Sequence, residues 1–161
     1  MRVGSGYDVH RLVPDRRLVL GGIVIPFNKG LLGHSDADVL IHAVIDALLG
    51  AAALGDIGYH FPDTDPEYKD ISSLKLLSLT CRMVLKQKYM VTNIDCTVLA
   101  QAPKLGPYRN AMIQEIAEIL NIHENQINIK FTTTEGLGEI GKGEGIGAMC
   151  VVLLNEISES D

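Results

Sequence analysis

The chain has 161 residues, close to the usual size of one domain, and about two-thirds of the surface of an unfolded chain of this length can be buried. Its 47% of hydrophobic residues and 21% of charged residues exclude an intrinsically disordered protein. A formal net charge of −6 argues against a binder of nucleic acid or of anionic membranes. Cys81, Cys96 and Cys150 are odd in number and widely spaced, which predicts reduced thiols in a cytoplasmic protein.

The most hydrophobic stretch, residues 39–54, is too short for a membrane span and carries His42 and Asp46, which are costly in lipid. We therefore expect a buried helix and a soluble protein. No signal or transit sequence is recognisable before the first predicted strand. Residues 1–161 are expected to form a single domain with one catalytic function.

The N-terminal third of the chain predicts two strand regions and a helix. In order these are a strand over 1–10, a strand or hairpin over 17–27, a loop over 30–33 and a helix from Ser35 to about Leu54. Gly21-Gly22 marks a bulge or a hairpin turn. Ser35 is expected to be the N-cap, with Asp38 three residues later in a capping-box-like position.

The rest of the chain mixes strands and helices without a strict βαβ rhythm. In order we expect a loop over 56–70, a helix over 72–88, a strand over 94–100, a helix opened by Gly106-Pro107, a strand over 127–133 and a strand over 147–157. This order predicts an α+β fold, an α/β layer sandwich in which three main helices pack on a mixed β-sheet.

Four of the five histidines lie in the first 60 residues, each near an aspartate. Asp8 and His10 are two apart on a predicted strand, so their side chains share one face. Asp38, His42 and Asp46 are spaced by four and form a polar stripe on an otherwise apolar helix. A buried helix keeps such a stripe when it faces water, a charged partner or a metal.

One carboxylate and two imidazoles, from Asp8, His10 and His42, are a three-ligand set typical of zinc with an open fourth position. The spacing alone leaves a second interpretation open, in which Asp8 and His10 are a strand-surface pair and His42 is a histidine of the core.

A glycine-rich segment follows Thr132-Thr133-Thr134-Glu135, with six glycines in the twelve residues 136–147. Its backbone amides could hold an anion, but a mobile surface loop explains the composition equally well. The segment leads into a strand instead of opening a helix, so its match to a dinucleotide fingerprint is rejected. Gly143 stands where a phosphate-binding loop of the Walker type needs Ser or Thr, so that match is rejected too.

Residues 30–70 are rich in acidic side chains and would repel a phosphate. A divalent metal would reverse the local charge and make the same region attractive to an oligophosphate. The candidate metal ligands and the Thr/Gly/Lys loop together suggest metal-assisted phosphoryl chemistry.

Several rare motifs occur in an order that resembles the 2-C-methyl-D-erythritol 2,4-cyclodiphosphate synthases of the non-mevalonate isoprenoid pathway. They are GYDVH (6–10), LLGHSDADVLIHAVIDALLGAAALGDIG (31–58), FPDTDP (61–66), AQAPKL (100–105), TTTE (132–135) and GKGEGIGA (141–148). The resemblance covers nearly the whole length of the chain.

The resemblance implies a lyase that cyclises 4-diphosphocytidyl-2-C-methyl-D-erythritol 2-phosphate. The 2-phosphate attacks the β-phosphorus, CMP leaves, and 2-C-methyl-D-erythritol 2,4-cyclodiphosphate is formed. It further implies zinc, or another divalent ion, on Asp8, His10 and His42, and magnesium or manganese with the diphosphate next to Glu135. The phosphates would be oriented by His34 and Thr133.

The resemblance also implies binding residues for each part of this substrate. On the methylerythritol side they are Ser35, Asp56, Ile57, Gly58, Phe61, Pro62, Asp63, Thr64 and Asp65. On the cytidine and phosphate side they are Ala100, Gln101, Ala102, Pro103, Lys104, Leu105, Gly106, Thr132, Thr134, Glu139 and Lys142.

Members of this family are homotrimers with active sites between subunits, so we expect a homotrimer that binds a small nucleotide diphosphate and neither nucleic acid nor membrane. Two positions depart from the family pattern. Glu139 replaces a common aromatic residue, which weakens the case for an apolar inter-subunit pocket for isoprenoid diphosphates. Lys142 replaces a common arginine and loses bidentate phosphate contact.

Two other functions remain compatible with the candidate metal ligands. A zinc-dependent phosphohydrolase would hold water at the open metal position and release free phosphate. A non-catalytic trimer stabilised by metal would need four protein ligands, whereas the sequence offers three.

Overall fold

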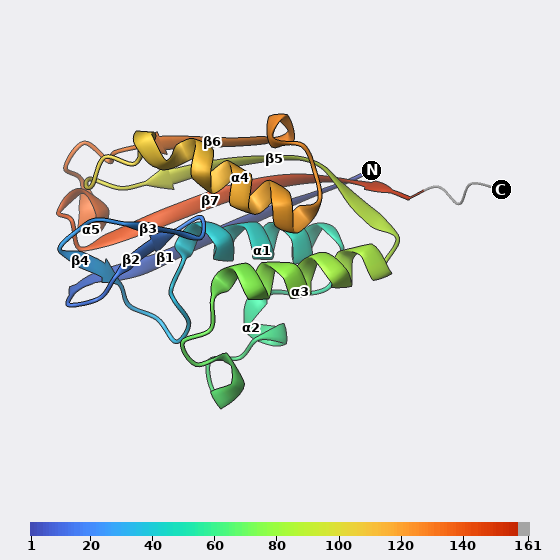
Figure 1. Cartoon of the computed structure of the whole chain (residues 1–161), viewed down its shortest axis with the longest axis horizontal. Coiled ribbons are helices and arrows are strands. Elements are labelled where there is room, and N and C mark those ends of the chain that lie inside the picture. Colours follow the sequence, from blue (N-terminus) through green and yellow to red (C-terminus); the bar gives the residue numbers. More distant parts are fainter. Residues whose placement is uncertain (158–161) are drawn as a thin grey trace.

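The computed structural model describes residues 1–157, which form a five-stranded sheet covered on one face by helices (Figure 1). The strands are β1 (Arg2–Pro14), β2 (Leu18–Leu20), β3 (Ile23–Ile25), β4 (Lys29–Leu31), β5 (Tyr89–Leu99), β6 (Ile127–Thr132) and β7 (Gly145–Glu156). The helices are α1 (Val39–Ala51), α2 (Ile57–His60), α3 (Ser73–Lys86), α4 (Arg109–Leu120) and α5 (Gly138–Gly141), with 3-10 turns η1 (Pro66–Tyr68), η2 (Gly106–Tyr108) and η3 (Glu124–Gln126).

The main sheet has the strand order β4-β1-β7-β5-β6 and is mixed. β5 and β6 are parallel neighbours joined through α4, whereas the other neighbouring pairs are antiparallel. β2 and β3 form a separate hairpin. The predicted α+β class, with a mixed sheet and three main helices (α1, α3 and α4), is confirmed.

The two faces of the sheet differ in what covers them. Along β7, Ala148, Cys150 and Val152 are buried beneath the helices, while Met149 and Val151 are exposed. β1 continues this pattern, because Val3, Tyr7 and Val9 are also exposed. We call these five exposed side chains of β1 and β7 the open face.

Helix α1 lies unusually close to β1. A methyl group on Gly4 would come within 2.0 Å of the carbonyl oxygen of Ala47, and one on Gly6 within 2.0 Å of that of Ala43. Only glycine allows the helix backbone to rest on the strand at these positions. This contact places the first turns of α1 directly beside the alternate residues of β1 that face the helices.

Asp38, and not Ser35 as expected, is the N-cap of α1. Its carboxylate accepts the Ile41 amide of the helix at 3.1 Å, and it also accepts the amides of Gly21 and Gly22 at 3.0 and 2.7 Å. Asp38 therefore ties the β2–β3 turn to the start of α1, a tertiary role that the local sequence pattern does not reveal. Burial raises the pKa of this fully buried carboxyl group, and the three amides oppose that shift.

Three expectations about loops are corrected by the structure. Residues 30–33, predicted as a loop, contribute to the edge strand β4, which pairs with the far end of β1. Residues 56–70 are not without regular structure, because they contain α2 and η1. The glycine-rich segment contains α5, a single helical turn of four residues.

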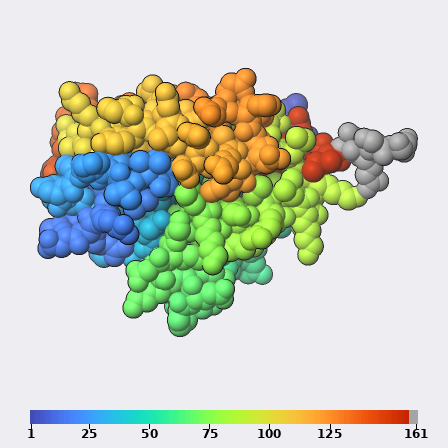
Figure 2. Space-filling view, viewed as in Figure 1, coloured from blue at the N-terminus to red at the C-terminus, as the bar shows by residue number. Residues whose placement is uncertain are grey.

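The segment that holds α2 and η1 projects from the body of the molecule and forms the lower lobe in Figure 2. The lobe is tied to the loop before α1, since the Asp70 amide donates to the His34 carbonyl at 2.8 Å and the Asp36 amide donates to the Ile71 carbonyl at 3.1 Å. Within residues 1–157, no helix is long and apolar enough to cross a membrane.

Candidate active site

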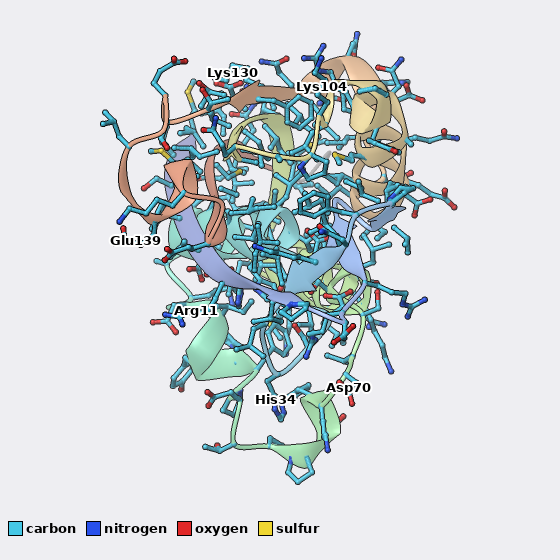
Figure 3. The ribbon with its side chains drawn as sticks, turned by 90° about the vertical axis from the view of Figure 1, so that its left-hand side faces the viewer. Arg11, His34, Asp70, Lys104, Lys130 and Glu139 are labelled. Atoms are coloured by element: carbon cyan, nitrogen blue, oxygen red, sulfur yellow. The ribbon has the colours of Figure 1, made fainter. Side chains whose placement is uncertain are left out.

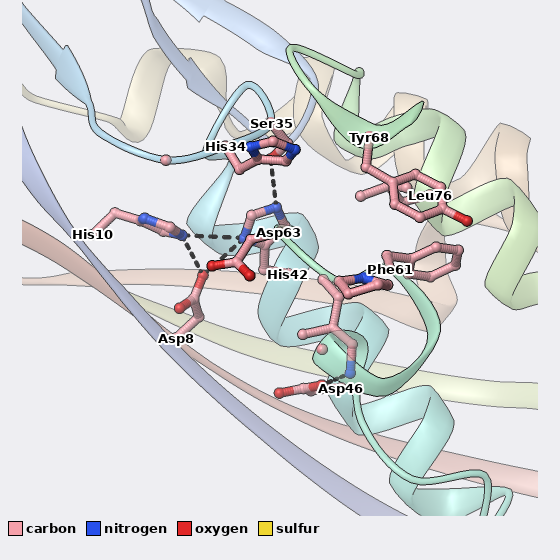
Figure 4. A pocket seen from close by; sticks show the side chains of 14 residues that line it. Asp8, His10, His34, Ser35, His42, Asp46, Phe61, Asp63, Tyr68 and Leu76 are labelled. Atoms are coloured by element: carbon pink, nitrogen blue, oxygen red, sulfur yellow. Dashed lines mark hydrogen bonds and ion pairs between the residues drawn. The ribbon is translucent and has the colours of Figure 1, made fainter. Parts of the chain in front are cut away.

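Asp8, His10 and His42 converge at one point between β1 and α1 (Figure 4). Asp8 Oδ2 lies 2.9 Å from His10 Nε2 and 3.0 Å from His42 Nδ1, and the two ring nitrogens are 3.2 Å apart. Each residue offers one ligand atom, and the three atoms lie within 4.8 Å of one another. The sequence prediction that these residues form one cluster is confirmed.

The backbone brings this cluster together in two steps. Asp8 and His10 lie on the same face of β1 as Gly4 and Gly6, so they point toward the helices. The close approach of α1 at those glycines then brings His42, in the first turn of the helix, against both side chains.

The electrostatics of the cluster favour the charged forms of Asp8 and His10. Burial alone would raise the pKa of Asp8, but hydrogen bonds and charge interactions with His10 and His42 outweigh it and hold that pKa well below its usual range. Burial alone would lower the pKa of His10, but the hydrogen bond and charge of Asp8 outweigh it and raise that pKa above 6.5.

The ring nitrogens that face away from the cluster are also held. His10 Nδ1 donates to the Leu32 carbonyl oxygen at 2.7 Å. His42 Nε2 lies 2.9 Å from Ser73 Oγ and 3.2 Å from Ser35 Oγ. Metal-binding histidines are typically fixed in this way, with one nitrogen on the ion and the other on a protein acceptor. The donor set and its surroundings therefore fit a divalent ion with three protein ligands and an open position.

The cluster lines a cavity of about 450 Å³ between α1 and the lobe (Figure 4). His34 stands on one side, and its Nε2 donates to the Asp65 carbonyl oxygen at 3.1 Å. The aromatic rings of Phe61 and Tyr68 stack edge to face on the lobe side, with centroids 5.5 Å apart. A charged cluster thus meets a partly apolar wall, which suits a ligand with a phosphate end and a carbon skeleton.

A second cavity, of about 560 Å³, lies between the loop after β5 and the end of β6. Its lining includes Lys104, Arg109, Thr133 and Glu135. Thr133 Oγ1 donates to Glu135 Oε1 at 3.0 Å, and the backbone of Glu135 has a positive φ of 53°, so the two residues form a tight turn at its edge.

The two cavities share no lining residue within the described part of the chain. Figure 3 shows His34 and Lys104 at opposite ends of the molecule, with the sheet between them. A single chain therefore presents a metal-ligand cavity and a separate basic cavity that do not meet.

The family model described as the YgbB family matches residues 1–155. The chain belongs to this family. A curated relative from Desulfatibacillum aliphaticivorans, named 2-C-methyl-D-erythritol 2,4-cyclodiphosphate synthase, is 62% identical over 154 residues, which cover 96% of this chain and 99% of the relative. The predicted family and enzyme class are thereby confirmed.

Solved structures of the same family share the fold. IspF from Plasmodium falciparum, in a complex with CDP, has a TM-score of 0.86 and 36% identity, covering 98% of this chain and 97% of that one. The bifunctional IspDF of Campylobacter jejuni has a TM-score of 0.93 and 44% identity over 96% of this chain, which spans 42% of that longer protein.

The site residues implied by the family resemblance divide between the two cavities. The first is lined by Asp8, His10, His34, Ser35, His42, Ile57, Gly58, Phe61, Pro62 and Asp63. The second is lined by Ala100, Gln101, Pro103, Lys104, Leu105, Gly106, Thr132, Thr133 and Glu135. Asp56, Thr64, Asp65, Ala102, Thr134, Glu139 and Lys142 lie outside both linings.

Ser73, near the three candidate metal ligands, was not identified from the sequence, whereas Asp46 was noted there in the polar stripe of the helix. Ser73 contacts His42, and its hydroxyl donates to Asp36. Asp46 lines the first cavity and accepts the Ile57 amide at 2.8 Å, which positions the start of α2. Ser73 lies at the start of α3, far along the chain from His42, so no local spacing pattern could have linked the two.

Proposed function

We propose that this chain converts 4-diphosphocytidyl-2-C-methyl-D-erythritol 2-phosphate to 2-C-methyl-D-erythritol 2,4-cyclodiphosphate and CMP. The observation that carries the proposal is the convergence of Asp8, His10 and His42 at a cavity in a chain 62% identical to a synthase of that name. In the reaction, an oxygen of the 2-phosphate forms a bond to the β-phosphorus. The bond from that phosphorus to the bridging oxygen breaks, and CMP leaves with this oxygen.

Asp8, His10 and His42 would hold zinc, which would supply Lewis-acid chemistry for the phosphates of the substrate. The protein contributes no covalent nucleophile, so its residues act by positioning the phosphates and excluding water. His34 stands beside the cluster and is suited to orient a phosphate. Ser35, Ile57, Gly58, Phe61, Pro62 and Asp63 would surround the methylerythritol skeleton.

The second cavity would take the cytidine diphosphate end. Its Lys104 and Arg109 side chains supply positive charge for phosphates, and the loop 100–106 supplies backbone groups for the base. Glu135 would hold magnesium or manganese, which would neutralise phosphate charge, and Thr133 donates a hydrogen bond to the Glu135 carboxylate. The CDP bound to the Plasmodium falciparum relative supports a ligand of this class.

We further propose that the protein is a homotrimer in which the first cavity of one subunit meets the second cavity of its neighbour. Two observations support this assembly. The open face exposes Val3, Tyr7, Val9, Met149 and Val151, and an exposed apolar patch of this kind usually marks a surface that binds another protein chain. One substrate must also contact both cavities, which are separate within one chain.

We place the protein in the cytoplasm and treat residues 1–161 as one synthase domain. The three cysteines are buried free thiols, in keeping with a reducing compartment. Cys96 and Cys150 face each other across β5 and β7, and the hydrogen bond that the Cys150 thiol donates to Cys96, together with burial, raises the pKa of Cys150 far above its usual range. These thiols therefore pack as small hydrophobic groups.

Phosphorus NMR of the purified protein with the substrate, zinc and magnesium tests the proposed reaction. Formation of CMP and a cyclic diphosphate in equal amounts is expected. Release of free phosphate would instead identify a phosphohydrolase, and an unchanged substrate would refute the assignment. Light scattering tests the assembly, with an expected mass three times the 17.5 kDa of one chain.

A further inference from the structure

His42 can present Nδ1 to a metal only if its proton resides on Nε2. A neutral imidazole carries one N–H, and the hydrogen bond made by one nitrogen decides which nitrogen that is. The surroundings of His42 Nε2 therefore determine whether the cluster of Asp8, His10 and His42 can bind an ion without rearrangement.

The closest group to His42 Nε2 is Ser73 Oγ, at 2.9 Å. Ser73 is fully buried, so its hydroxyl has only protein partners. This hydroxyl donates its single hydrogen to Asp36 Oδ1. A serine hydroxyl has one hydrogen, so Ser73 Oγ can only accept from His42, and His42 must donate from Nε2.

Asp36 is itself held in place as an acceptor. Its Oδ2 accepts the Ser73 amide at 2.9 Å, and its Oδ1 accepts the Asp38 amide at 3.2 Å as well as the Ser73 hydroxyl. Because three donors point at this carboxylate, it has no hydrogen to offer Ser73, and the direction of the whole chain of hydrogen bonds is fixed.

We propose that Asp36 and Ser73 are positioning residues that act in series to hold His42 with Nε2 protonated and Nδ1 directed at the metal. Neither residue touches the substrate or the ion. Ser35, whose Oγ is 3.2 Å from His42 Nε2 and accepts the Ala37 amide, is a secondary acceptor. This proposal rests on the metal site assigned above, but its first test does not need a metal.

The first test is nitrogen-15 NMR of the His42 ring in the metal-free protein. The wild type is expected to carry a proton on His42 Nε2, whatever the state of Nδ1, which lies 3.0 Å from Asp8 Oδ2. Ser73→Ala and Asp36→Asn should each lower the fraction of His42 that is protonated on Nε2. Ser72→Ala is a matched control, because Ser72 is an exposed serine, one residue away, whose side chain makes no cap hydrogen bond.

The second test is zinc affinity, measured by competition with a chelator. Loss of a group that orients a histidine ligand typically weakens metal binding about 10- to 100-fold, so Ser73→Ala and Asp36→Asn should fall in that range. The double variant should bind about as weakly as Ser73→Ala alone, because the two residues act through the same hydrogen bond. Ser72→Ala should match the wild type.

The outcomes separate this proposal from the proposed function. Unchanged protonation of His42 Nε2 and unchanged zinc affinity in both folded variants would overturn the positioning role. A second outcome is a wild type that binds no zinc while its His42 Nε2 protonation still responds to Ser73→Ala. That result would refute the metal site but support the hydrogen bonds that link His42, Ser73 and Asp36. Circular dichroism monitors folding of each variant. If Ser73→Ala does not fold, Asp36→Asn alone provides the test.

Discussion

His10 and His42 use opposite ring nitrogens for the same purpose. His10 turns Nε2 toward Asp8 and gives Nδ1 to the Leu32 carbonyl, whereas His42 turns Nδ1 toward Asp8 and gives Nε2 to Ser73. The difference follows from their elements, because one ring reaches the cluster from a strand and the other from the first turn of a helix. Each ring is fixed by a partner outside the cluster.

Zinc affinity is expected to fall as the pH falls. Zinc must displace the proton from His10, whose pKa is raised above 6.5 because the hydrogen bond and charge of Asp8 outweigh burial. Protonated His10 therefore competes with the ion at a higher pH than an ordinary histidine would. Below the His10 pKa, the apparent affinity should drop roughly tenfold per pH unit for each competing proton.

Chelator competition between about pH 8 and about pH 6 measures this dependence. The chelator's own protonation is calibrated in protein-free samples. An affinity that stays constant across this range would show that His10 does not lose a proton on binding, and would remove it from the ligand set.

At the residue scale, the sequence was sufficient to predict the cluster but not the residues around it. The two-residue spacing of Asp8 and His10 and the polar position of His42 identified the three candidate ligands that converge in the structure. Asp36 and Ser73 were missed because their contact with each other joins two distant segments, and serine and aspartate before a helix are ordinarily explained as caps.

Among the elements, the contact between α1 and β1 matters most to the site. Gly6→Ala would place a methyl group 2.0 Å from the Ala43 carbonyl oxygen, so the helix must move away from the strand. The expected cost is about 1–3 kcal/mol of unfolding free energy, typical of overpacking. Zinc affinity should fall as well, because His42 moves with α1 while Asp8 stays on β1.

Urea denaturation at fixed protein concentration and chelator competition measure the two effects. Gly50→Ala is the matched control, since Gly50 is exposed on the same helix and a methyl group there meets nothing closer than 3.9 Å. It should raise stability by about 0.5–1 kcal/mol, as for a glycine removed from a helix. If the Gly6→Ala variant has the stability and the zinc affinity of the wild type, the proposed role of this contact is contradicted.

The longer elements were predictable because their periodicity is strong. The helix over 72–88 and the strand over 127–133 match α3 and β6 within two residues at each end. β4 was not predicted, because three residues carry no periodic signal and form a strand only by pairing with β1. The start of α1 was misplaced because both Ser35 and Asp38 are good caps locally, and the β2–β3 turn decides between them.

At the scale of the whole molecule, the proposed trimer explains why the open face is apolar and exposed in a single chain. Val151→Glu would put a charge in the middle of this apolar patch, where Val151 is 48% exposed in the single chain. The expected result is a folded monomer of 17.5 kDa that retains zinc but loses cyclase activity, because the two cavities no longer meet. Light scattering, chelator competition and phosphorus NMR measure these three properties.

Val24→Glu is the matched control for this variant. Val24 is 51% exposed on β3, in the hairpin outside the main sheet, so the same change there should leave mass and activity unchanged. If Val151→Glu keeps the mass and the activity of the wild type, the open face is not the interface.

Because the two cavities are separate, two inactive variants with different defects should restore activity when they assemble together. His42→Ala spoils only the first cavity and Glu135→Ala only the second, so each should be inactive when assembled alone. In trimers refolded from an equal mixture, some interfaces join an intact first cavity to an intact second one. Random assembly makes about one interface in four competent, so about a quarter of wild-type activity should return. Native mass spectrometry checks that mixed trimers form, and an inactive mixture that contains them would contradict a site shared between two chains.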